Sequence, residues 1–93
     1  MIEAKIYDSL SSRKKREIRE QYVRDQNGIC PVCDCPLAGE PRADIKALPL
    51  DLELFPPNFL GHPVHLQHNH ITGLTEAAVH AYCNGVIWQY QGK

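Results

Sequence analysis

The first quarter of the chain has the apolar period of a helix. From about Ser9 to Gln26, a modest apolar stripe at Ile18, Tyr22 and Val23 runs through otherwise polar positions. Serines near the start of this stretch are good N-caps, and the Asn-Gly pair after it is a good stop because both residues tolerate a left-handed backbone. The pattern predicts one N-terminal helix.

The last third of the chain predicts a β-hairpin followed by a helix. Val64–His68 and Thr75–His80 are two short runs typical of strands, and the polar, glycine-ended segment 69–73 between them has the composition of a turn. Within that turn we expect the Asn69 amide to bond the backbone rather than to do chemistry. The segment 84–90 predicts a short closing helix.

The region between these elements lacks a helical period. Residues 36–63 hold six of the seven prolines, which predicts an insertion loop. Inside it, Leu48–Leu54 alternates with period two and predicts a short edge strand. We expect this strand to pack on the domain; a strip that binds a partner is the alternative.

Length and composition indicate one small intracellular domain. A chain of 93 residues buries only somewhat more than about 60% of its unfolded surface, so a bound metal ion that cross-links the chain would contribute to its stability. The sequence has no apolar run of membrane-spanning length and its start lacks the apolar stretch of a signal peptide, so we expect no membrane partner and a cytoplasmic location. In that reducing compartment, four cysteines favour metal binding over disulfides.

Charge is distributed unevenly along the chain. The formal net charge is −1, but residues 1–24 hold seven basic and four acidic side chains, whereas the remainder holds three and seven. A basic end can contact phosphate, although a solvated helix face fits the charge equally well. The basic residues that we expect to meet nucleic acid are Arg13, Lys14, Lys15, Arg16 and Arg19.

Two half-sites predict a zinc centre. Cys30 and Cys33 are separated by two residues, as are His80 and Cys83, and this spacing lets each pair converge on one tetrahedral ion. Four protein ligands leave no position for solvent, so the zinc would be structural. The alternative, a redox dithiol, needs a βαβ context that the pattern lacks. Cys35 is left over; it could replace Cys33, but a free thiol is expected.

Three histidines lie within six residues between the two half-sites. His65, His68 and His70 form a polar, metal-capable cluster that packing alone does not explain. His70 could contact phosphate or brace the loop, and bracing is favoured. His62 is expected to be a loop residue. The aromatic residues of the closing helix are expected to be core residues rather than base-stacking platforms; these are Trp88 and Tyr90.

Three segments together resemble a known nuclease family. Residues 26–33, 66–73 and 79–84 look like the HNH (His-Me finger, ββα-metal) nucleases, most closely the phage recombination endonuclease VII group. That group has a helix leading to Cys-x-x-Cys, an Asp-His-x-His-x-x-Gly hairpin, and a Cys-x-x-Cys-Asn at the start of a helix. The resemblance leaves out the insertion. It implies a small α+β fold in one domain, residues 1–93, with a basic N-terminal helix (1–28), an insertion (36–63) and a zinc-stapled ββα core (64–91).

The resemblance also implies residue roles. His68 would be the general base, Asn84 and the residue at position 67 would bind a catalytic divalent ion, and the structural zinc would be held by Cys30, Cys33, His80 and Cys83. A neutral imidazole is suited to take a proton from water. A hard cation such as Mg²⁺ accepts an amide oxygen and would stabilise charge on the leaving oxygen.

The chain departs from the family pattern at two positions. His80 stands where the group has Cys, an exchange that a zinc site tolerates. Gln67 stands where the group has Asp, so the catalytic ion loses a charged ligand. Because side chains alternate along a strand, His65 would share a face with Gln67 and serve as an auxiliary ligand. Mn²⁺ or Ni²⁺ is then expected to work better than Mg²⁺.

The sequence therefore predicts a metal-dependent endonuclease that hydrolyses DNA phosphodiesters. The alternative is a catalytically weak or inactive zinc module of the same fold that binds DNA or a protein; Gln67 favours it, and the presence of His68 and Asn84 argues against it. A protein-interaction adaptor that uses Leu48–Leu54 would leave the histidine cluster unexplained.

Overall fold

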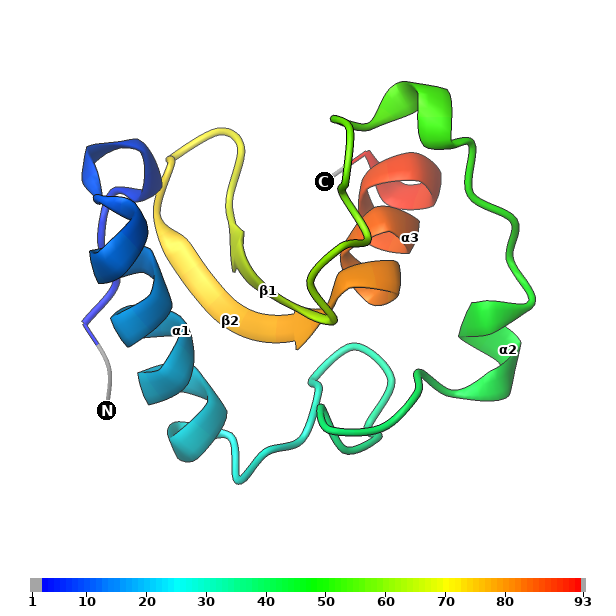
Figure 1. Ribbon diagram of the computed structural model, residues 1–93, viewed down its shortest axis with the longest axis horizontal. Coiled ribbons are helices and arrows are strands. Elements are labelled where there is room, and N and C mark those ends of the chain that lie inside the picture. The colour runs from blue at the N-terminus through cyan, green and yellow to red at the C-terminus, as the bar shows by residue number, and fades with distance from the viewer. Residues whose placement is uncertain (1–2, 93) are drawn as a thin grey trace.

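The fold is built around a two-stranded antiparallel hairpin with helices on either side of it (Figure 1). The computed structural model describes residues 3–92. Its elements in chain order are η1 (Tyr7–Ser9), α1 (Ser12–Asp25), α2 (Ala43–Lys46), η2 (Leu52–Leu54), β1 (Val64–His68), β2 (Thr75–His80) and α3 (Ala81–Gln91). This is the small α+β architecture that the sequence predicts. Within the described range, no helix combines the length and the apolar character needed to cross a bilayer.

Helix α1 confirms the predicted N-terminal helix, with a later start. The hydroxyl of Ser11 accepts a hydrogen bond from the backbone N–H of Lys14, so Ser11 is the N-cap and the helix begins at Ser12. The segment expected to open the helix forms the separate turn η1. Asn27 and Gly28 take positive φ values of 54° and 71°, which ends the helix as expected.

Side chains at the end of α1 attach the helix to β2. The amide of Gln26 makes two hydrogen bonds of 2.8 Å with the backbone N–H and C=O of Ala78, as a neighbouring strand would. The hydroxyl of Tyr22 lies 3.2 Å from the carbonyl oxygen of Thr75. Ile18 and Tyr22 are buried in the core, which they share with Val79. The apolar stripe of α1 therefore packs on the hairpin.

The hairpin has the predicted bounds and contains a β-bulge. Gln67 pairs with Ala77 and His68 pairs with Thr75, which leaves Glu76 of β2 without a partner. The side-chain oxygen Oδ1 of Asn69 accepts hydrogen bonds from the backbone N–H groups of Ile71 and Thr72 in the turn, as predicted. A bulge bends the strand and re-aims neighbouring side chains. The strict alternation assumed for β1 therefore fails at its end.

Helix α3 begins three residues earlier than predicted, at Ala81 rather than Asn84. Its first turn consequently contains Cys83 and Asn84. The buried residues of α3 lie in its first half, and its second half carries exposed aromatic residues. Trp88 and Tyr90 are 42% and 47% exposed, so the prediction that they belong to the core is wrong.

The insertion contains no strand, and the prediction for Leu48–Leu54 is wrong. This segment lies against α3, where no strand edge is available to pair with it. Its backbone bonds side chains instead: the amide of Gln89 donates to Pro49 O (3.1 Å) and accepts from Asp51 N (2.8 Å). The period-two pattern thus comes from leucines in an irregular chain that ends in η2.

The insertion nevertheless packs on the domain, as predicted. Leu50 contacts the buried Gly85 of α3, where a Cβ would lie only 2.8 Å from Leu50 Cδ1. The glycine therefore permits the close approach of insertion and helix. The short helix α2 also lies beside α3, and the hydroxyl of Tyr82 donates to Lys46 O and Leu48 O.

Candidate metal centre and histidine pocket

Four buried side chains form a compact cluster that is compatible with a structural zinc. The ligand atoms of Cys30, Cys33, His80 and Cys83 all lie within 4.8 Å of one another. These residues are 0%, 1%, 2% and 0% exposed. They come from the turn after α1, the end of β2 and the first turn of α3, so one ion would join three parts of the fold.

The backbone of the cysteine turn orients its two thiols. Cys30 O accepts from Asp34 N (2.8 Å), and Cys30 N donates to Cys35 O (2.9 Å). Asp34 has a φ of 61°, which lets the chain reverse within the turn. Cys35 is partly exposed and lies outside the cluster, which agrees with its expected role as a free thiol.

His80 is oriented so that one ring nitrogen faces the cysteines. Its Nε2 lies 2.9 Å from Pro36 O and 3.1 Å from Gly39 O, so this nitrogen carries the proton and donates. Its Nδ1 lies 3.4 Å from Cys33 Sγ and 3.7 Å from Cys83 Sγ. A histidine held by a carbonyl on one nitrogen presents the lone pair of the other, as metal ligands do.

The thiols of the cluster are electrostatically coupled. A hydrogen bond from Cys83 lowers the pKa of the Cys30 thiol, and the same contact raises the pKa of the Cys83 thiol. Adjacent thiolates repel one another, whereas a divalent cation would favour the ionised form of all three. Three sulfurs and one nitrogen are a donor set that fits tetrahedral zinc.

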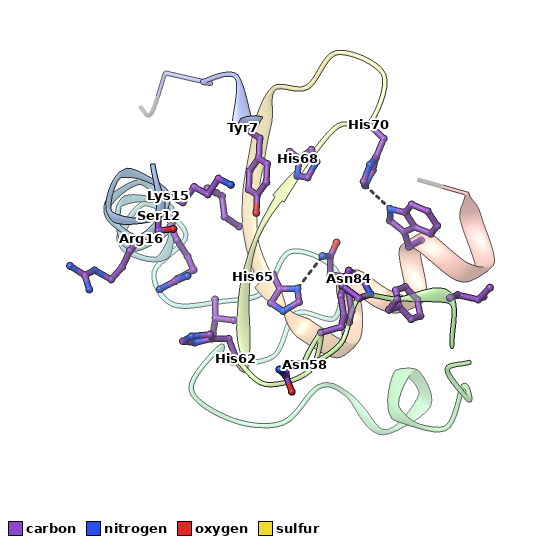
Figure 2. A pocket seen from close by; sticks show the side chains of 18 residues that line it. Tyr7, Ser12, Lys15, Arg16, Asn58, His62, His65, His68, His70 and Asn84 are labelled. Atoms are coloured by element: carbon purple, nitrogen blue, oxygen red, sulfur yellow. Dashed lines mark hydrogen bonds between the residues drawn. The ribbon is translucent and has the colours of Figure 1, made fainter. Parts of the chain in front are cut away.

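A second, open site lies in a cavity of about 880 Å³ between α1, the hairpin and α3 (Figure 2). It contains most of the predicted catalytic residues. The imidazole and amide side chains among its lining residues are Asn58, His62, His65, His68, His70 and Asn84.

His68 is held between two rings. Tyr7 stacks on it with a centroid distance of 4.0 Å and an interplanar angle of 10°, and His70 lies 4.6 Å away on a tilted plane. Partial burial lowers the pKa of His68, and positive charge at His70 and at Lys15 lowers it further, while the carboxylates of Asp8 and Glu76 partly oppose this shift. The imidazole is therefore neutral at neutral pH, which is the form that can accept a proton.

His65 and Asn84 meet in the same cavity. The Asn84 amide nitrogen lies 3.2 Å from His65 Nδ1 (Figure 2). The Phe59 ring and the imidazole meet nearly at right angles, with their centroids 4.8 Å apart. Burial lowers the pKa of His65. These two side chains are hydrogen-bonded to each other, which places an imidazole and an amide side by side.

Gln67 lies apart from His65 and Asn84. Its amide donates to Glu76 Oε1 at 2.6 Å, beside the bulge, and it is not among the residues that line the cavity. Alternation predicts that Gln67 shares a face with His65. In the structure the cavity is instead lined by Val64, His65, Leu66 and His68 of β1, and a register shift lies between Gln67 and His68.

His70 braces the turn, which is the role favoured from the sequence. The indole N–H of Trp88 donates to His70 Nε2 at 2.6 Å, so the turn is tied to α3. His70 also lines the cavity, and a contact with bound phosphate is compatible with this position.

The five basic candidates on α1 fall into two groups. Lys15, Arg16 and Arg19 line the cavity, whereas Arg13 and Lys14 form exposed ion pairs with Glu17 at 3.3 and 3.4 Å. Figure 2 shows Lys15 and Arg16 extending from α1 on the opposite side of the histidines from Asn84. No aspartate or glutamate of the described residues lines this cavity, so its polar wall is cationic.

Sequence reasoning missed the aromatic residues of the cavity. Tyr7, Phe55 and Phe59 line it, and Trp88 does so rather than packing in the core. One signal was available, since Phe55 and Phe59 flank two prolines where no helix or strand would bury them. Tyr7 carries no such signal because its contact with His68 depends on tertiary packing.

Comparison with known proteins gave no match: no family model, no curated protein and no solved structure is significantly similar to this chain.

Proposed function

We propose that this protein is a metal-dependent endonuclease of the HNH type that hydrolyses DNA phosphodiester bonds. The observation that carries the proposal is the position of His68. It is a neutral, stacked imidazole in an open cavity whose polar wall is formed by Lys15, Arg16 and Arg19.

The chemistry assigned to these residues is hydrolysis by an activated water. The cationic side chains of α1 bind the phosphates of the strand, and His68 takes a proton from the attacking water. The bond from phosphorus to that oxygen forms as the bond to the leaving sugar oxygen breaks. Tyr7 stacks on His68 and fixes the orientation of its ring.

His65 and Asn84 are the proposed ligands of a divalent ion in the cavity. Such an ion, when bound, supplies a Lewis acid for the scissile phosphate and stabilises the leaving oxygen. With an imidazole and an amide as donors and no carboxylate nearby, the site suits Mn²⁺ or Ni²⁺ better than Mg²⁺.

The cluster of three cysteines and His80 is proposed to hold a structural zinc. Its ligand Cys83 is directly followed by Asn84 in the first turn of α3. Zinc would therefore fix the position of Asn84 in the cavity while taking no part in the reaction.

A second candidate is a zinc module of the same fold that binds nucleic acid without cutting it. The observation in its favour is the carboxylate-free cavity, together with the hydrogen bond that holds Gln67 on Glu76. A hard cation would find few ligands there, but phosphate binding by α1 would remain.

The test is incubation of supercoiled plasmid with zinc-loaded protein and Mg²⁺, Mn²⁺ or Ni²⁺, with conversion to nicked circles as the readout. The parent is expected to nick best with Mn²⁺ or Ni²⁺. His68→Ala should slow nicking by about 10² to 10⁴ because the general base is lost.

Ile71→Ala is the control, because Ile71 is 95% exposed in the same hairpin and lies outside the cavity. It should nick as the parent does. Nicking by His68→Ala at the parent's rate would disprove the assignment of the base. No nicking with any metal, alongside retained DNA binding, would favour the second candidate.

A further inference from the structure

The cavity is bordered by a continuous series of aromatic rings, of which the proposed hydrolysis uses only Tyr7, His65 and His68. Seven of the rings that line it form a series in which each contacts the next. In order the pairs are Tyr7–His68 at 4.0 Å, His68–His70 at 4.6 Å, His70–Trp88 at 5.3 Å, Trp88–Phe55 at 6.2 Å, Phe55–Phe59 at 4.5 Å and Phe59–His65 at 4.8 Å.

Three of these rings form one wall, which we call the aromatic wall: Phe55, Phe59 and Trp88. Phe55 and Phe59 come from the insertion and Trp88 from α3. Trp88 is 42% exposed and Phe55 and Phe59 are partly exposed, although each could have been buried in a core. The hydrogen bond from Trp88 to His70 fixes the plane of the indole. Partly exposed aromatic rings that are held in place by their neighbours are suited to stacking.

The opposite wall is cationic. Lys15, Arg16 and Arg19 line the cavity from α1, and no carboxylate of the described residues opposes them. The two kinds of wall lie on the two sides of the hairpin, with α1 on one side and α3 on the other (Figure 1). A ligand with an anionic backbone and flat rings complements both walls at once.

An unpaired nucleotide has this combination of groups. In a duplex each base is stacked on its neighbours and its faces are covered, whereas a single strand can place a base on an aromatic side chain and its phosphates on cations. The cavity volume of about 880 Å³ is sufficient for a small-molecule-sized unit such as a nucleotide.

We propose that the cavity binds unpaired DNA, with bases stacked on the aromatic wall and phosphates on Lys15, Arg16 and Arg19. The protein therefore prefers single-stranded or frayed DNA to intact duplex. This inference rests on the proposed function for its nucleic-acid substrate and adds the structural class of that substrate. It also gives the insertion a role, because Phe55 and Phe59 belong to it.

Binding can be measured apart from cleavage. Zinc-loaded protein is titrated into a fluorescein-labelled 12-nucleotide DNA, single-stranded or annealed, without added divalent ions, and fluorescence anisotropy gives both affinities. Single-stranded DNA should bind several-fold more tightly. Trp88 is the only tryptophan of the chain, so its emission should also be quenched by unlabelled single strands and not by duplex.

Two variants of Trp88 distinguish the effect of base stacking from the effect of side-chain size. Trp88→Phe and Trp88→Leu both lose the hydrogen bond to His70, but only the first keeps a ring. Trp88→Leu should lose about tenfold in single-strand affinity, and Trp88→Phe should keep most of it. Tyr90→Leu, an exposed aromatic of α3 outside the cavity, is the control and should bind as the parent does.

Equal or tighter binding of the duplex would overturn the inference, as would equal affinities of Trp88→Phe and Trp88→Leu in folded protein. The outcome is independent of catalysis. Duplex plasmid nicking with no single-strand preference would leave the proposed function standing and remove this inference. A preference for single strands without nicking in any metal would support the binding inference and contradict the proposed nuclease function.

Discussion

The hairpin carries two sites of opposite character. The cysteine–histidine cluster is sealed, since its four residues are at most 2% exposed and their donor atoms face one another. The histidine cavity is open, holds His65 and His68 on one side and cations on the other, and contains no carboxylate among the described residues. A closed set of soft donors suits a structural ion, whereas an open cavity suits an ion or substrate that exchanges.

The two sites are joined by adjacent residues. Cys83 belongs to the cluster and Asn84 lies in the cavity, both in the first turn of α3. Changes to the sealed site should therefore affect folding and, because the cavity depends on the fold, also binding and chemistry at the open site. Changes to the open site should affect chemistry and binding but leave the fold intact.

The largest effect is expected from disrupting the cluster. Cys33→Ser should unfold the domain, because losing one of four ligands weakens a zinc centre whose binding free energy is folding free energy. Cys35→Ser is the matched control, since Cys35 lies outside the cluster. Circular dichroism during heating, with elemental analysis, should show loss of cooperative melting and of zinc in the first variant only. Equal melting of both variants would contradict a structural role for the cluster.

A smaller effect is expected from adding a carboxylate, and its position matters. Asn84→Asp adds a charge beside His65 in the cavity, so Mg²⁺-supported nicking should rise on the order of tenfold. Gln67→Asp places the charge near Glu76 outside the cavity and should leave the metal preference unchanged. The assay is a titration of Mg²⁺ and Mn²⁺ against plasmid nicking. A gain in Gln67→Asp but not in Asn84→Asp would show that the family position, rather than the bulged geometry, binds the ion.

The cysteine–histidine cluster and Gln67 illustrate what the sequence could and could not predict. The residues of the cysteine–histidine cluster follow from local spacing, and the hairpin bounds follow from strand pattern and turn residues, so both were accessible. Gln67 bonds Glu76, which a bulge leaves unpaired in the opposite strand. A pattern in one strand cannot reveal a register shift that its partner imposes.

The insertion shows a second limit of the sequence. The alternation in Leu48–Leu54 is genuine, but a strand needs a free edge to pair with, and this segment meets the side chains of α3 instead. The exposure of Trp88 likewise follows from tertiary packing, because its ring lines the open cavity and contacts His70 and Phe55. Tertiary packing overrides local pattern in both cases.

The cations of α1 should differ in their effect on DNA binding. Lys15→Ala or Arg16→Ala should weaken binding several-fold and lower the salt slope by about one, because each removes a phosphate contact from the cavity wall. Arg13→Ala and Lys14→Ala, whose partners are Glu17, should change little. Binding isotherms at several salt concentrations give both quantities. Equal losses at all four positions would indicate a diffuse basic surface rather than a site.

The smallest effect is expected from pH. An imidazole accepts a proton only when it is neutral, so if His68 is the base, nicking should be lost as pH falls through its pKa. Burial and the charges of His70 and Lys15 lower that pKa more than Asp8 and Glu76 raise it, so the half-maximal rate should occur below the usual histidine value of about 6.5. Initial rates across the acidic and neutral range measure it. A half-maximal rate above pH 7 would argue against His68 as the base.

The most direct test of the two-site account is native mass spectrometry of the parent and of His65→Ala after exposure to Mn²⁺. The parent is expected to hold one zinc per chain that survives exchange, plus one manganese that dialysis removes. His65→Ala should keep the zinc and lose the manganese, because only the open site is changed. A parent that folds without zinc, or a variant that keeps both ions, would contradict the division of the hairpin into a sealed centre and an open one.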